Sequence, residues 1–254
     1  MDEQRFWTHE AIVDHLQLVD DDTLLDLGCG IGHTLLTAAR RPAPVQLVGI
    51  DIDKQALAVA DSRLSSIGAT TRLVHADLSH RLPIRARSVT KVACHDVLEW
   101  LVDPSALLVE ATRVMREDAL SVWSHTDYDS TVIQGADQDL TRRVVHAYSD
   151  SAETCAGHSD GQMGRKLVGI VRRSPLEMID VDAYVLRRTG LSGPAKLRID
   201  NMVTVLRRAA AGDEVNLTLE ELERWRASIV AADKHGDFFY AQTAYMVVAK
   251  KTRA

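Results

Sequence analysis

The chain has 254 residues, 46% of them hydrophobic and 26% charged, which is ordinary for a globular protein that buries a core. Its net charge of −6 argues against a large nucleic-acid-binding face, because such a face needs clustered positive charge. The three widely spaced cysteines form neither a disulfide framework nor a zinc-binding C-x-x-C pair. No apolar run approaches the roughly 20 residues of a membrane span, and no apolar leader is visible, so we expect a cytoplasmic protein.

The first half of the chain alternates short apolar strands with helices. A helix is predicted over residues 3–18, because its apolar residues recur at helical spacing. The elements predicted after it are strands Thr23–Leu27, Gln46–Asp51, Thr71–His75, Ser88–Cys94 and Leu120–His125, and helices Thr34–Arg40, Lys54–Ile67 and Pro104–Arg116. This alternation is typical of βαβ units, whose strands form a parallel sheet covered by helices on both faces.

The second half is less regular. Residues 128–176 are polar and contain glycine, so we expect an irregular segment with one helix near 139–148. Strands are predicted over 177–187 and 238–249, and helices over 197–211 and 219–232. Thr218 and Glu221 form a capping-box pattern, which places the start of the last helix.

A glycine-rich turn, Asp26-Leu-Gly28-Cys-Gly30-Ile-Gly32, joins the first strand of this sheet to the next helix. Glycine lets the backbone turn sharply and approach a ligand closely, and ligands of parallel sheets bind at this edge. Asp51 ends the following strand, where a carboxylate can accept hydrogen bonds from both hydroxyls of a ribose.

The spacing of this turn indicates the charge of its ligand. The glycines follow the pattern G-x-G-x-G, whereas a pyrophosphate-binding turn uses G-x-G-x-x-G. Asp26 precedes the turn, and its carboxylate would repel a phosphate but would attract an ammonium group. We therefore expect a cationic cofactor without phosphate.

Four segments carry a family resemblance. The sequence LLDLGCGIGHT at 24–34 resembles motif I of class I S-adenosylmethionine-dependent methyltransferases, and VGIDID at 48–53 resembles their second-strand motif. HADL at 75–78 and CHDVLEWLVDP at 94–104 are similar to the segments after the third and fourth strands, the latter as in UbiE-like small-molecule and tRNA-uridine methyltransferases. The resemblance covers about residues 20–127 and implies S-adenosyl-L-methionine as the cofactor.

The resemblance also assigns residues to the cofactor. It implies that Asp26 and the backbone of Gly28 and Gly30 hold the methionine part, and that Asp51 binds the ribose. It further implies that Ile52 packs on the adenine, that Asp77 and the Leu78 amide bind the adenine edge, and that the backbone carbonyl of His95 accepts from the cofactor ammonium.

The fold implied by this family is α/β, with a doubly wound, seven-stranded, mostly parallel Rossmann-like sheet whose last strand is antiparallel. We expect a single domain, 1–254, in which 1–20 form an N-terminal helical lid and 21–127 form the cofactor-binding core. Helical insertions at 128–176 and 188–237 would form a cap over the acceptor pocket. Enclosing insertions suit a small-molecule acceptor better than a polymer.

Three residues at the predicted end of the fifth strand are candidates for catalysis: His125, Asp127 and Tyr128 in SHTDYDS. Methyl transfer from a sulfonium is an in-line displacement that needs alignment and, for some acceptors, a general base, but no metal. A histidine titrates near neutral pH and suits that role, although a loop histidine with a structural hydrogen bond is an equally good interpretation.

Other functions remain open on the sequence alone. The VLEW segment allows an RNA methyltransferase, against which the acidic chain argues. A nicotinamide-dependent oxidoreductase would use a related sheet, but the turn spacing and Asp26 disfavour it. A non-catalytic, cofactor-binding partner protein would retain the same turn. The acceptor atom (oxygen, nitrogen or carbon) and the oligomeric state cannot be deduced from these patterns.

Overall fold

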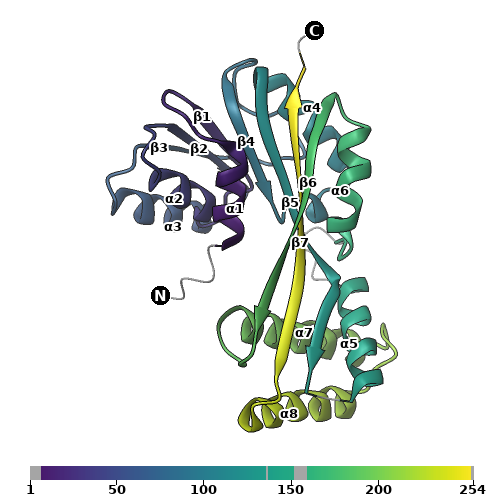
Figure 1. Cartoon of the computed structure of the whole chain (residues 1–254). Helices are drawn as coiled ribbons and strands as arrows, with labels where there is room; N and C mark the ends of the chain where they lie inside the picture. Colours follow the sequence, from purple (N-terminus) through teal and green to yellow (C-terminus); the bar gives the residue numbers. More distant parts are fainter. Residues whose placement is uncertain (1–6, 136, 152–158, 253–254) are drawn as a thin grey trace. The chain divides into compact units, whose positions relative to one another are not determined.

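The computed structural model describes residues 7–135, 137–151 and 159–252. Its centre is a seven-stranded sheet with the order β3-β2-β1-β4-β5-β7-β6, in which β7 runs opposite to its neighbours (Figure 1). The strands are β1 Thr23–Leu27, β2 Gln46–Asp51, β3 Thr71–His75, β4 Val89–His95, β5 Met115–Gln134, β6 Leu176–Arg188 and β7 Phe239–Lys251. The predicted fold class, a mostly parallel doubly wound sheet with an antiparallel last strand, is confirmed.

The helices are α1 Trp7–Leu16, α2 His33–Ala39, α3 Lys54–Ser65, α4 Pro104–Val114, α5 Gln138–Asp150, α6 Met163–Arg172, α7 Gly193–Ala211 and α8 Leu219–His235, with a short 3-10 helix, η2, at Leu98–Trp100. None of the described helices combines the length and the apolar character that crossing a membrane requires.

The chain divides into two compact units. We call residues 7–125, 166–182 and 245–252 the core unit, and residues 126–165 and 183–244 the helical unit. The two segments of the helical unit overlap the two insertions expected from the sequence. β5, β6 and β7 each contribute residues to both units.

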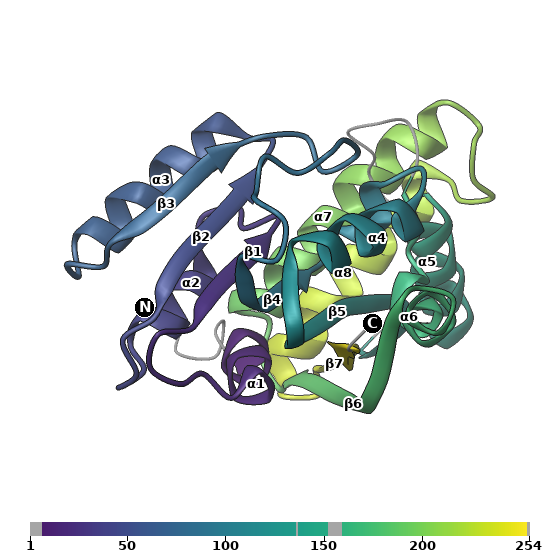
Figure 2. The same ribbon diagram turned by 90° about the horizontal axis from the view of Figure 1, so that it is seen from above.

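In the core unit, parallel pairing brings the ends of several strands to one edge of the sheet. Leu27 at the end of β1 lies opposite Ile50 in β2 and Cys94 in β4. Asp51 at the end of β2 pairs in register with His75 at the end of β3. The turns after these strands therefore meet at a common edge of the sheet. Figure 2 shows β3, β2, β1, β4 and β5 side by side in this order, seen from above.

Local capping explains where two of the core helices begin. The Asp53 carboxylate accepts hydrogen bonds from the first backbone N–H groups of α3, at 2.8 Å from Gln55 and 3.2 Å from Ala56. Asp103 plays the same part for α4, whose first residue is Pro104. Proline suits this position because its ring presets φ and its missing N–H would have no intrahelical partner.

The helical unit has a hydrophobic core of its own, formed by α5, α7 and α8, which lie together in Figure 1. Trp225 of α8 is fully buried there, and its indole N–H donates to Thr141 of α5 at 3.1 Å. The capping box predicted for Thr218 and Glu221 is confirmed, because both of its hydrogen bonds are present at the start of α8.

The helix predicted near 139–148 is confirmed as α5, Gln138–Asp150. The rest of the segment 128–176 is more regular than predicted, because β5 continues to Gln134 and a further helix, α6, covers Met163–Arg172. The polar composition of this segment hid a narrow apolar stripe, since Leu167 and Val171 of α6 are fully buried while Arg165 and Lys166 are charged. A helix needs only one apolar stripe to be stable against a core.

Candidate functional site

The glycine turn after β1 adopts a conformation that requires glycine. Gly28, Gly30 and Gly32 have φ values of 70°, 49° and 80°, in the left-handed region that side chains disfavour. A Cβ atom on Gly28 would lie 2.2 Å from Cγ2 of Val97. The backbone N–H groups of Gly28 and Cys29 donate to the carbonyl of Ile50 at 2.8 and 3.0 Å, which fixes the turn to the end of β2.

Asp51 connects this turn to the start of α3. Its Oδ2 accepts from the backbone N–H of Gly30 at 2.7 Å, and its Oδ1 accepts from the backbone N–H of Asp53 at 2.8 Å. Each carboxylate oxygen can accept more than one hydrogen bond. These contacts therefore orient the Asp51 side chain and leave acceptor capacity for the hydroxyls of a ligand.

Asp26 is a buried carboxyl group at the end of β1, only 2% exposed. Burial, together with the nearby charge of Asp51, raises its pKa to about 8, although a hydrogen bond with Thr34 acts in the opposite direction. Its Oδ2 has no hydrogen-bond partner within the described part of the chain. A buried acceptor without a partner is costly, so a cation placed here would be bound strongly.

The residues predicted to hold an adenine lie after β2 and β3. The Ile52 side chain is 63% exposed, so its apolar surface is available to an aromatic ring. Asp77 accepts from the backbone N–H of Ser79 at 2.8 Å and lies 3.2 Å from His80, and the Ser79 hydrogen bond lowers its pKa. Leu78 is buried beside it. The Asp77 carboxylate is therefore ionised and oriented by its own turn.

A group of histidines lies near the end of β4. His95 contacts the Ser124 hydroxyl at 3.1 Å, and the ring of His9 in α1 meets the His95 ring edge-on with centroids 5.1 Å apart. His9 also stacks on His33 at 5.2 Å. Burial, followed by the neighbouring His95, lowers the pKa of His9 well below its ordinary value. His9 is therefore neutral near pH 7.

His125, the predicted base, is fully buried between two acidic residues. Its Nδ1 lies 3.5 Å from Oδ1 of Asp96, and its Nε2 lies 3.7 Å from Oε1 of Glu99. Glu99 is itself 2% exposed. Neither acid was among the residues selected from the sequence, although both belong to the CHDVLEW segment that resembles the fourth-strand motif.

The other two predicted catalytic residues belong to the helical unit. Asp127 is fully buried, and its carboxylate accepts from Nε and Nη2 of Arg165 at 2.7 Å each. The backbone N–H groups of Ser130 and Arg165 donate to the same carboxylate at 3.1 and 3.2 Å. These hydrogen bonds hold the Asp127 side chain in place against Arg165 and Ser130, which favours a structural role for Asp127. Tyr128 is buried beneath Arg198.

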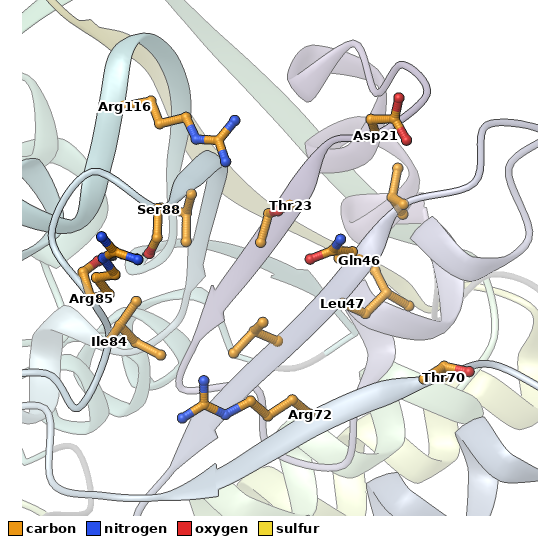
Figure 3. Close-up of a pocket in the computed structure, with 13 residues that line it drawn as sticks. Asp21, Thr23, Gln46, Leu47, Thr70, Arg72, Ile84, Arg85, Ser88 and Arg116 are labelled. Atoms are coloured by element: carbon orange, nitrogen blue, oxygen red, sulfur yellow. Dashed lines mark hydrogen bonds between the residues drawn. The ribbon is translucent and has the colours of Figure 1, made fainter.

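A separate cavity of about 530 Å³ lies at the opposite edge of the core sheet (Figure 3). Thr23, Gln46 and Val89, which begin β1, β2 and β4, are among the residues that line it. Three exposed arginines, Arg72, Arg85 and Arg116, also face it. The glycine turn lies at the other ends of these strands, so this cavity is distinct from the candidate cofactor site.

Comparison with known families gives one match over the candidate site. A family model described as a methyltransferase domain matches residues 25–122. This range contains the glycine turn, Asp51, Asp77 and His95. It ends just before His125.

Curated relatives extend the comparison. An uncharacterized 37.1 kDa protein in a transposon of Streptomyces fradiae is 28% identical, over 95% of this chain and 66% of its own length. A malonyl-[acyl-carrier protein] O-methyltransferase of a Marinomonas species is 32% identical, over 52% of this chain and 46% of its own length. The chain thus spans about two thirds of the first relative and about half of the second.

Solved structures share the fold. The YcgJ protein of Bacillus subtilis is 17% identical with a TM-score of 0.63, over 97% of this chain and 99% of its own. A geranyl diphosphate C-methyltransferase of Streptomyces coelicolor, solved with S-adenosyl-L-homocysteine, is 14% identical with a TM-score of 0.56, over 96% of this chain and 75% of its own. At such low identity these likenesses establish the fold.

Proposed function

We propose that this chain, whose residues 25–122 match a methyltransferase domain, is a class I S-adenosylmethionine-dependent methyltransferase that transfers the methyl group of that cofactor to a small molecule. The observation that carries the proposal is the buried Asp26 carboxyl beside the glycine turn. Its unpartnered oxygen is matched to a cationic ligand, and S-adenosylmethionine carries positive charge on both its ammonium and its sulfonium.

The described residues fit this cofactor. Asp26 and the backbone of Gly28 and Gly30 would hold the methionine part, and Asp51 would accept from the ribose hydroxyls. The exposed Ile52 would lie against the adenine. Asp77 and the Leu78 amide would bind the adenine edge, and the His95 carbonyl would accept from the ammonium.

The chemistry requires little from the protein beyond alignment. When bound, the cofactor supplies a methyl group activated by a positive sulfur, and the electron pair of the breaking carbon–sulfur bond goes to that sulfur. The protein's task is to hold an acceptor lone pair in line with the methyl carbon and to exclude water. An oxygen or nitrogen acceptor that carries hydrogen must also lose a proton.

His125 is our candidate for the base that accepts this proton. Its ring nitrogens lie 3.5 Å from Asp96 and 3.7 Å from Glu99, so two carboxylates are placed to orient the ring and to stabilise it once protonated. Substituting His125→Gln should lower turnover by about 10²-fold with little change in cofactor affinity. His235→Gln, an exposed histidine of α8, is the matched control. Unchanged turnover in His125→Gln would remove His125 from the mechanism.

Two observations favour a small molecule over RNA as the acceptor. The net charge of the chain is −6, which opposes binding of a polyanion. The methyl acceptors named for the relatives include malonyl-[acyl-carrier protein] and trans-aconitate. An RNA-binding assay over a salt series separates the two classes, because RNA recognition would give an affinity that falls steeply with salt.

The direct test of the proposal is calorimetric titration of the native chain and of Asp51→Ala with S-adenosyl-L-homocysteine. Loss of two ribose hydrogen bonds to a charged acceptor should weaken binding by roughly tenfold or more. Asp61→Ala, an exposed aspartate of α3, is the control and should bind like the native chain. Undiminished affinity in Asp51→Ala would contradict the assigned site, and no binding by the native chain would contradict the proposed function.

A further inference from the structure

The helical unit holds an arginine inside a group of tyrosines. Arg198 of α7 lies with Tyr128 of β5, Tyr148 of α5 and Tyr240 of β7, and we call these four residues the tyrosine cage. The guanidinium carbon lies 4.4 Å above the Tyr128 ring centroid, and Nη1 donates to the Tyr148 hydroxyl at 2.9 Å. The three tyrosines are between 0% and 6% exposed.

Further hydrogen bonds fix the positions of the cage side chains. The Tyr148 hydroxyl also accepts from Nδ2 of Asn201 at 2.9 Å. The Tyr240 hydroxyl donates to Gln242 at 3.0 Å, and the Gln242 amide donates to Thr131 at 3.1 Å. The cage is therefore a preorganised polar site in a hydrophobic core, and ordering it again for a ligand would cost little.

Arg198 has no counter-charge in the described part of the chain. Other arginines of the same unit are ion-paired, such as Arg143 with Glu221 at 2.8 Å and Arg226 with Asp200 at 2.6 Å. Asp200, two residues from Arg198, is shared between Arg226 and Lys196. The guanidinium of Arg198 is left with aromatic faces and hydroxyls for neighbours.

Tyr240 does not supply the missing negative charge near neutral pH, because burial raises its pKa and its hydroxyl keeps its proton. Burial acts to lower the pKa of Arg198, but electrostatic interactions with Tyr128, Tyr148 and Tyr240 and the hydrogen bond with Tyr148 outweigh it, so the pKa is raised. Arg198 is half-buried, and no carboxylate pairs with it among the described residues, so an anion would supply the missing counter-charge.

One more donor points to an anion. A phenol oxygen can accept two hydrogen bonds and donate one, and both acceptor positions of Tyr148 are used by Arg198 and Asn201. No described residue accepts from the Tyr148 hydroxyl. The cage thus offers the O–H donor of Tyr148 beside the Arg198 guanidinium.

We propose that the tyrosine cage binds the carboxylate group of a small molecule, with Arg198 and the Tyr148 hydroxyl as its donors. All four residues of this ligand site lie within the helical unit. A single cation matches the single charge of a carboxylate, and a guanidinium binds that planar group in bidentate geometry. A doubly charged phosphate would leave one desolvated negative charge without a partner.

The test uses the full chain, saturated with S-adenosyl-L-homocysteine, and two matched pairs of probes: benzoate with benzamide, and hexanoate with hexanamide. Binding is measured by ligand-observed NMR for the native chain, Arg198→Met and Tyr148→Phe. Arg207→Met is the matched control, because Arg207 lies on the same helix, half exposed and paired with Glu223. Inorganic phosphate is a further probe.

We expect a carboxylate to bind the native chain and Arg207→Met, and to bind Arg198→Met at least about tenfold more weakly. Tyr148→Phe should weaken carboxylate binding severalfold, while the affinity for either amide should be the same in all of the variants. Because an uncompensated charge is removed, Arg198→Met should unfold at an unchanged or higher temperature.

The inference is wrong if neither carboxylate binds the native chain. It is also wrong if Arg198→Met and Tyr148→Phe both bind the carboxylates as tightly as the native chain does. A third contrary result is that phosphate binds more tightly than either carboxylate and that this binding depends on Arg198. If Arg198→Met fails to fold, Arg198 is needed for the stability of the helical unit. Carboxylate binding to Tyr148→Phe then tests the inference. Calorimetry with S-adenosyl-L-homocysteine separates this inference from the proposed function, because failure of the cage leaves cofactor binding intact.

Discussion

At the scale of single residues, Asp26 links cofactor binding to pH. Its pKa of about 8 means that the carboxyl holds a proton at neutral pH, and a cation nearby would favour release of that proton. Affinity for S-adenosyl-L-homocysteine should therefore rise between about pH 6 and pH 8, by at most tenfold per unit, with proton uptake by the buffer. Calorimetry in buffers of different ionisation enthalpy measures both quantities, and a flat profile would contradict the role of Asp26.

Asp26 also makes the stability of the fold depend on pH. The pKa of Asp26 is about 8 in the folded protein and 3.8 ordinarily, so the folded state holds this proton more tightly than the unfolded state. The stability from Asp26 is therefore fully present below about pH 4 and is lost as the pH rises through about 8. Asp26→Asn should match the native chain near pH 4 and exceed its stability increasingly toward pH 8, as measured by urea unfolding.

The neighbours of His125 and Arg198 come from segments far away in the sequence. His125 lies in a strand that reads as SHTDYDS, and its contacts with Asp96 and Glu99 come from a segment nearly thirty positions earlier. Arg198 looks like one charged position on a helix, yet it is surrounded by tyrosines from three other elements. Only the fold brings these groups together.

At the scale of elements, one close neighbour restricts which residue the turn after β1 accepts at position 28. Gly28 and Gly68 have nearly equal φ values of 70° and 72°, but a Cβ on Gly28 would lie 2.2 Å from Val97, whereas one on Gly68 would meet open space. Both Gly→Ala changes should cost about 1 kcal/mol through backbone strain. Gly28→Ala should cost about 1–3 kcal/mol more through overpacking.

Urea unfolding of the two variants measures this difference. Adding Val97→Ala to Gly28→Ala removes the clashing methyl groups and should recover part of the stability. Equal costs for Gly28→Ala and Gly68→Ala would show that the contact with Val97 is relieved by a small backbone shift.

At the scale of the whole molecule, the two compact units share β5, β6 and β7. Unfolding one unit would break strands that continue into the other, so we expect one cooperative transition. In native-state hydrogen exchange, the most protected amides of β1 in the core unit and α8 in the helical unit should open with the same free energy. If the amides of α8 exchange through an opening of lower free energy while those of β1 stay protected, the expectation of one cooperative transition is wrong.

Much of the core unit was predictable because its signals are local. β2 and β3 match their predicted limits, and β1 does too, since each is a short apolar run ended by polar or glycine residues. The match to a methyltransferase domain was predictable from motifs of a few residues each. The helical unit was harder, because the extension of β5 over residues 126–134 is mostly polar in sequence and lacks the apolar pattern of a buried strand.

The sequence by itself determined the sheet and the glycine turn and indicated the charge of the proposed cofactor, because backbone conformation and a neighbouring carboxylate are properties of adjacent residues. The tertiary structure decided which side chains lose water and which meet a partner. It paired Asp127 with Arg165, placed His125 between Asp96 and Glu99, and enclosed Arg198 among tyrosines without a carboxylate. Those outcomes depend on burial and on contacts between distant segments, which the order of residues along the chain does not record.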